Sequence, residues 1–135
     1  PVMLGGKRLL DGGVSDPIPV KWMLSRGYEK NVVVLTRDVK YRKKANPKMQ
    51  LFLKAVLHKY PAFLKDLEER HIHYNETLEE LASLEKEGRI HIIRPSSPIQ
   101  AAMIERDESN LERIYQTGRA DMKKDLEKLK AYLDS

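Results

Sequence analysis

The sequence predicts an α/β fold whose first part alternates strands with a helix and whose second part is mostly helical. The first observation is the order of the N-terminal segments: a short strand at 7–10, a helix begun by prolines, and a β-branched run at 31–36. The second is that apolar residues after position 36 recur at spacings of three and four, which is the period of a helix. We therefore expect an α/β part over 1–36 and a mostly helical extension with one short strand over 37–135.

A β-hairpin is expected at the start of the chain. Residues 2–4 and 7–10 flank Gly5 and Gly6, and two glycines between short strands favour a tight hairpin turn. Asp16 is suited to cap the helix that follows the second strand.

A second strand is expected after that helix. Gly27 is suited to end the helix, and residues 31–36 are apolar on both faces, as in a strand buried inside a parallel sheet. Strand, helix and strand joined by short loops make a βαβ unit. We therefore expect the strand at 7–10 to run parallel to the strand at 31–36.

Helices dominate the rest of the chain. One helix is expected at about 47–58, and a long one runs from Pro61 to near Gly88. Its apolar seam consists of Leu64, Leu67, His71, Tyr74, Leu78 and Leu81. A short strand at 90–94 and a last helix capped by Asp107 or Ser109 complete the chain.

Composition bounds the class of protein. The chain has 135 residues, of which 41% are hydrophobic and 33% charged, and its net charge is +5. These values suit a folded, water-exposed domain. No apolar run approaches the ~20 residues of a membrane span, and no secretory signal is visible. We expect a cytoplasmic location, with peripheral attachment to a membrane as the alternative.

Asp11 is the strongest candidate for chemistry. It follows the strand at 7–10 and precedes two glycines, so its carboxylate lies on a sharp turn beyond a strand end, where α/β enzymes hold working groups. The alternative is that Asp-Gly-Gly is simply a turn, because Asp and Gly both suit turn conformations.

Several segments resemble one known family. The most specific are Asp11-Gly12-Gly13, Asp16-Pro17-Ile18-Pro19-Val20 and Val32-Val33-Val34-Leu35-Thr36-Arg37, with looser agreement at 41–44, 74–78 and 93–95. They resemble the catalytic-aspartate part of the patatin-like phospholipases, especially the bacterial branch. The resemblance is specific over 7–37 and fair to about position 120.

The resemblance implies ester hydrolysis. In that family the aspartate is the base for a serine nucleophile in Gly-x-Ser-x-Gly, and a glycine-rich loop stabilises the oxyanion. Neither element is present in this chain, so it resembles the C-terminal piece of a patatin-like α/β core with its helical extension. Asp11 would be the catalytic residue, a lipid or ester the substrate, and the missing N-terminal part of the same protein the partner. No cofactor is implied.

A basic segment follows the strand at 31–36. Its members are Arg37, Lys40, Arg42, Lys43, Lys44 and Lys48. They form either a solvated loop or a surface that attracts anionic phospholipid, on the same sheet edge as Asp11.

The second function considered is a non-catalytic basic module that binds nucleic acid or an anionic membrane. Tyr41 is the one aromatic residue among the basic ones, and no nucleic-acid motif is present, so we do not expect nucleic acid as a partner. We expect no metal site, because the chain has no cysteine and its four histidines lack a ligand set. His71 is expected to be packed and hydrogen-bonded.

Overall fold

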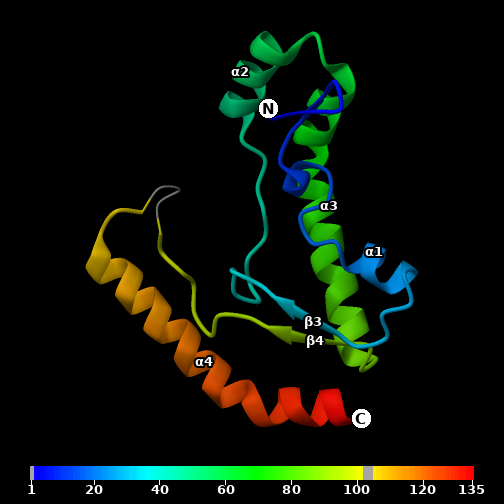
Figure 1. Cartoon of the computed structure of the whole chain (residues 1–135). Coiled ribbons are helices and arrows are strands. Elements are labelled where there is room, and N and C mark those ends of the chain that lie inside the picture. Colours follow the sequence, from blue (N-terminus) through cyan, green and yellow to red (C-terminus); the bar gives the residue numbers. More distant parts are fainter. Residues whose placement is uncertain (1, 102–104) are drawn as a thin grey trace. The chain divides into compact units, whose positions relative to one another are not determined.

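The computed structural model describes residues 2–101 and 105–135, and it is mixed α/β with small sheets and several helices (Figure 1). The chain forms two compact units. Unit 1 consists of Pro1–Pro19 and Arg42–Glu80, and unit 2 of Val20–Tyr41 and Leu81–Ser135. Each unit is built from two separate stretches of chain, and the expected boundary between residues 36 and 37 stays a prediction.

Unit 1 begins with the expected hairpin. Strands β1 (Val2–Leu4) and β2 (Lys7–Leu9) pair antiparallel. Gly5 and Gly6 form the turn with φ of 55° and 75°, a region that side chains disfavour. The two glycines therefore allow the tight reversal, and the hairpin prediction is confirmed.

Two helices complete unit 1. Helix α2 (Pro47–Leu57) begins where Asn46 Oδ1 accepts a hydrogen bond from Met49 N, at 3.1 Å, with proline at the first helical position. Helix α3 (Pro61–Lys86) follows, and its residues 61–80 belong to unit 1.

The predicted seam of α3 is confirmed as its covered face. Leu81 is fully buried, and the rest of the seam is half-buried: Leu64, Leu67, His71, Tyr74 and Leu78. The Nδ1 atom of His71 lies 2.9 Å from the carbonyl oxygen of Glu68. His71 is therefore packed and hydrogen-bonded, as its place in the seam predicts.

Unit 2 is built around one parallel pair of strands. Strand β3 (Asn31–Val34) runs parallel to β4 (Ile90–Ile93), with Val33 opposite Ile92. Helix α1 (Val20–Ser25) lies against β3, and helix α4 (Glu108–Asp134) lies against β4. Figure 1 shows the two strands side by side.

The two faces of β4 have different partners. Ile90 and Ile92 are buried on one face. Successive side chains of a strand alternate, so His91 lies on the opposite face, where its Nε2 is 2.5 Å from Asp125 Oδ2 of α4. The other buried apolar residues among those described are Val20, Leu81 and Leu84, all of unit 2. The core is therefore on the isoleucine face.

Tyr132 fastens the end of α4 to both strands. Its hydroxyl accepts a hydrogen bond from Asn31 N at 2.9 Å and donates one to Arg89 O at 3.0 Å. The ring also stacks on His91, with centroids 5.7 Å apart. At the other end of α4, Asp107 is the N-cap and accepts from Ser109 N and Asn110 N, which confirms one of the two expected caps.

Three expectations for the first strands and helix are wrong. Strand β2 pairs with β1, and the parallel partner of β3 is β4, so 7–10 and 31–36 do not form a βαβ unit. Helix α1 begins at Val20, so Asp16 does not cap it. Strand β3 has one neighbour among the described strands, and Val34 is 69% exposed rather than buried.

Leu81 is the best test of this core. It is 1% exposed, so Leu81→Ala should lower the free energy of unfolding by about 2–5 kcal/mol through lost burial and the cavity left behind. Leu51→Ala is the matched control, because Leu51 is 73% exposed, and it should change stability by no more than about 0.5 kcal/mol. Urea unfolding measures both, and equal effects of the two substitutions would contradict the described core.

Candidate functional site

Asp11 lies on a turn directly after β2. It is the N-cap of the short 3₁₀ helix η1 (Gly12–Val14), and its Oδ1 accepts a hydrogen bond from Gly13 N at 2.9 Å. Val14 N donates to the carbonyl oxygen of Asp11 at 3.2 Å. The carboxylate therefore orders its own turn, which confirms the turn interpretation; the catalytic role stays a prediction.

Glycine is favoured at position 13 of this turn for a steric reason. Neither Gly12 nor Gly13 has a positive φ, so backbone freedom does not explain them. A Cβ atom on Gly13 would lie 3.3 Å from Asp11 Oδ1, which is tighter than nine in ten real Cβ contacts. Gly13 thus leaves room for the carboxylate to fold back on its own backbone.

Arg70 holds the turn from outside. Its Nε donates a hydrogen bond to the carbonyl oxygen of Gly13 at 3.0 Å, across 57 residues of sequence. Arg70 is half-buried on α3, within unit 1. Sequence reasoning missed this residue, because an arginine beside the α3 seam carries no pattern that distinguishes it from a solvated one.

The second carboxylate oxygen of Asp11, Oδ2, is able to accept a further hydrogen bond. Asp11 is exposed, and among residues 2–101 and 105–135 no group donates a hydrogen bond to its Oδ2 or forms an ion pair with it. An ionised carboxylate oxygen without a donor can accept a proton from a hydroxyl placed beside it. The site can therefore act as a base, and in this chain no serine has the flanking residues of a nucleophile elbow.

The expected basic cluster is divided between the two units. Arg37 and Lys40 belong to unit 2, and the other four belong to unit 1: Arg42, Lys43, Lys44 and Lys48. The structure does not bring the six together as one patch within a unit.

The backbone of Lys43 is held by the side chain of Asn75. Its N–H donates to Asn75 Oδ1 at 2.9 Å, and its carbonyl oxygen accepts from Asn75 Nδ2 at 3.0 Å. Its ammonium group lies 5.3 Å from the ring centroid of Tyr74. This two-bond clamp ties the basic segment to α3, so Lys43 has a structural role there.

Lys40 borders a hollow of unit 2, and Arg37 directly precedes the segment that lines it. The guanidinium of Arg37 lies 5.1 Å from the ring centroid of Tyr41, and the hollow, of about 430 Å³, is formed by residues 38–41 and 96–98. These loops follow β3 and β4, so the hollow lies at the carboxyl ends of parallel strands, a common place for ligands in α/β folds. Asp38 Oδ1 accepts from Lys40 N at 2.9 Å, so a carboxylate accompanies the cations.

Asp121 of α4 fixes one wall of that hollow. Its Oδ2 accepts a hydrogen bond from Ser96 N at 2.9 Å. Hydrogen bonds from the N–H and then the hydroxyl of Ser96 hold the pKa of Asp121 below its ordinary value, with help from Lys124 and against partial burial. The tether is thus strongest when Asp121 is ionised.

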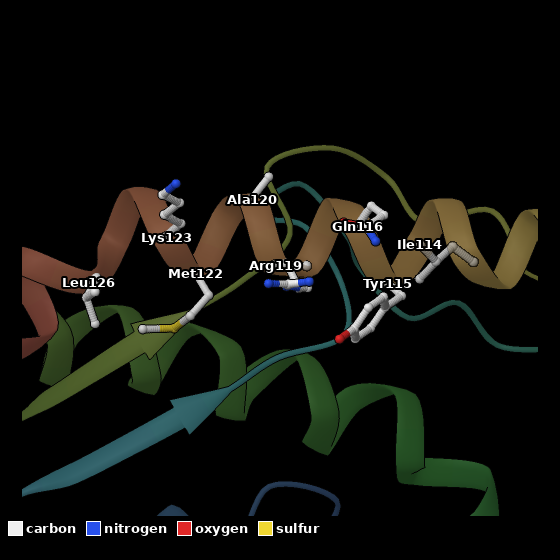
Figure 2. A pocket seen from close by; sticks show the side chains of 9 residues that line it. Ile114, Tyr115, Gln116, Arg119, Ala120, Met122, Lys123 and Leu126 are labelled. Atoms are coloured by element: carbon white, nitrogen blue, oxygen red, sulfur yellow. The ribbon is translucent and has the colours of Figure 1, made fainter.

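A larger hollow runs along α4 and is lined by that helix alone. In Figure 2, Tyr115, Met122 and Leu126 point to one side of the helix, and Ala120 and Lys123 to the other. Because a single helix lines it, this is an open amphipathic face rather than an enclosed site. No group of three metal-ligating side chains occurs in the described part of the chain, and none of its helices is long and apolar enough to cross a bilayer.

Comparison with known proteins gives one result. A family model described as a domain of unknown function, DUF6363, matches residues 60–134. That region begins just before α3 and ends in α4, so it includes Arg70 and leaves out Asp11 and the basic segment. No curated protein and no solved structure matches the chain.

The Asp121 tether should depend on pH. A carboxylate whose pKa is lower in the folded than in the unfolded state adds stability above the unfolded value, and that stability disappears as pH falls through the folded value. Asp121→Ala should therefore be less stable than the parent chain at neutral pH, with the difference starting to shrink near pH 4 and vanishing as pH falls through the lowered pKa of folded Asp121. Thermal unfolding across pH measures this, with Asp66→Ala as the control at an exposed carboxylate of α3. A difference that persists unchanged into acid would contradict the tether.

Proposed function

The chain belongs to the DUF6363 family, a domain of unknown function, and we propose that it is the C-terminal part of a serine–aspartate hydrolase that cleaves carboxylic esters of lipids. The observation that carries the proposal is the Asp11 carboxylate: exposed, directly beyond a strand, with one oxygen held by Gly13 N and the other without a donor among the described residues. The sequence resemblance around Asp11 to patatin-like phospholipases supports the same role.

The chemistry assigned to Asp11 is proton transfer. A serine hydroxyl is a weak nucleophile near neutral pH and needs a base at hydrogen-bond distance. The hydrogen bond from Gly13 N fixes Asp11 Oδ1, so Oδ2 takes the proton as serine Oγ forms a bond to the ester carbonyl carbon. The same proton then goes to the departing alkoxide, which leaves as an alcohol, and water hydrolyses the acyl-serine in the second step. The serine would be supplied by sequence upstream of Pro1.

Arg70 would be a positioning residue for this base. It touches the carbonyl oxygen of Gly13 and not the carboxylate, so its effect on Asp11 passes through the turn. Gly13 acts on the carboxylate in two ways, by donating its N–H and by leaving space where a Cβ would lie 3.3 Å from Oδ1. Fixing the carboxylate before the substrate arrives favours the reactive geometry.

The 135-residue chain alone should have no esterase activity, because it holds the proposed base without a nucleophile. A short-chain nitrophenyl ester is the substrate of choice, since it needs no membrane. Hydrolysis that survives stringent purification and disappears in Asp11→Ala would contradict the proposal that the nucleophilic serine lies outside this chain.

In the protein that carries a Gly-x-Ser-x-Gly segment upstream of Pro1, Asp11→Asn should lower kcat on the order of 10²-fold or more. The amide keeps the size of the side chain and can still accept from Gly13 N, so the fold should persist by circular dichroism. Asp16→Asn is the matched control, since Asp16 is exposed five residues further on and should retain the parent rate. A parent-like rate in Asp11→Asn would leave Asp11 with its turn role alone.

A further inference from the structure

Residues 42–59 have a composition that sets them apart from the rest of the chain. This stretch holds six lysines and arginines and no aspartate or glutamate, in a protein where acidic residues number 20. It contains all of α2. A basic stretch of this kind attracts anionic surfaces, and the structure of α2 indicates which kind.

One face of α2 contacts α3 through polar side chains. Gln50 Nε2 donates to the carbonyl oxygen of Glu68 at 3.3 Å, and Lys54 Nζ lies 2.9 Å from the carboxylate of the same residue. Leu53 and Leu57 lie on this side and are half-buried. The spacing of 50, 53, 54 and 57 is that of a single helical face, so the covered side of α2 is fully defined.

The opposite face of α2 is apolar and exposed. Leu51 is 73% exposed, Phe52 62% and Val56 57%. Lys48, near the N-terminal end of α2, falls on the same outward side at helical spacing, and Lys59 lies in the turn that follows the helix. The ammonium groups of both lysines are exposed and form no ion pair with any described residue.

We propose that α2 is a membrane-surface helix that lies flat in the interface of an anionic bilayer, with Leu51, Phe52 and Val56 among the acyl chains and the lysines at the phosphate level. An apolar helical face with basic residues on its flanks is the pattern of such helices. Charge complementarity indicates that the binding partner is an anionic bilayer. The basic residues near the apolar face match its negative headgroups, the apolar side chains match its acyl chains, and residues 42–59 contain no aspartate or glutamate. This function needs no chemistry from Asp11.

Nucleic acid is the less favoured anion. Binding of single strands uses aromatic platforms on which bases stack, and Phe52 is the one aromatic side chain on the outward face of α2. Three adjacent exposed apolar side chains instead match an apolar medium.

Vesicle co-sedimentation of the 135-residue chain tests the proposal. The chain should bind vesicles of phosphatidylcholine with phosphatidylserine and bind poorly to phosphatidylcholine alone, and binding should weaken as salt shortens the Debye length below ~10 Å. Phe52→Ser should reduce binding roughly tenfold or more, since burial of an apolar side chain of this size changes an equilibrium constant by at least about that factor. Leu133→Ser is the control, because Leu133 is 52% exposed on α4 and outside the basic stretch. Equal losses in both variants would overturn the proposal.

Fluorescence places the helix directly. Trp22 is the single tryptophan, so Phe52→Trp in a Trp22→Phe background gives one reporter on the outward face of α2. Its emission should shift to the blue and be quenched by brominated lipid when anionic vesicles are added, whereas Leu133→Trp in the same background should not respond. An unshifted emission at position 52, or tighter binding of a single-stranded RNA than of vesicles, would overturn the proposal. Asp11→Asn should bind vesicles like the parent chain, so failure of the hydrolase proposal and failure of this one are distinguishable.

Discussion

The parallel pairing of β3 with β4 is the constraint on which unit 2 depends. Each strand has four residues, and the buried apolar residues of the described chain all belong to this unit. A parallel pair cannot be closed by a tight turn and needs a long crossover, and here the intervening chain contains both α2 and α3. The hydroxyl of Tyr132 then reaches the starts of both strands, so the last helix depends on the same pair.

Unit 1 depends on a different kind of contact. Among the hydrogen bonds of its turn at Asp11, two have distinct origins: a local one from Gly13 N to the carboxylate and a distant one from Arg70 to Gly13 O. The local bond sets the orientation of the carboxylate, and the distant one ties the turn to α3. An exposed acidic side chain fixed in this way loses less conformational freedom when a reaction partner arrives, which is the physical basis for proposing a base role for it.

The sequence alone predicted the elements that depend on residues close together in the chain. The glycine pair at 5–6 predicted the hairpin, and the three–four spacing predicted the covered face of α3. Asp107 and Ser109 were the two residues expected to cap α4, and Asp107 is the cap. The partner of β3 was not predictable in this way, because residues 31–36 are compatible with any neighbouring strand. The pairing with β4 joins residues that are far apart in the sequence.

The residues of the candidate site also differ in whether a local sequence pattern indicates them. Asp11 was found from its turn residues, whereas Arg70 lies 57 residues from its hydrogen-bond partner and shows no local signal. The outward face of α2 was also hidden, because an apolar period in sequence reads the same whether another element covers it or not. The basic segment was expected to be either a solvated loop or a lipid-attracting surface, and in the structure Lys43 is clamped to Asn75 and Arg37 belongs to the other unit.

The central claim is that this chain supplies the base of a serine–aspartate pair whose serine lies upstream. The most direct measurement is the coding sequence that precedes the codon for Pro1. The account predicts an open reading frame continuous with this chain that encodes a glycine-rich loop followed by a Gly-x-Ser-x-Gly segment. An initiation codon directly before Pro1, or an upstream frame without that serine motif, would contradict it.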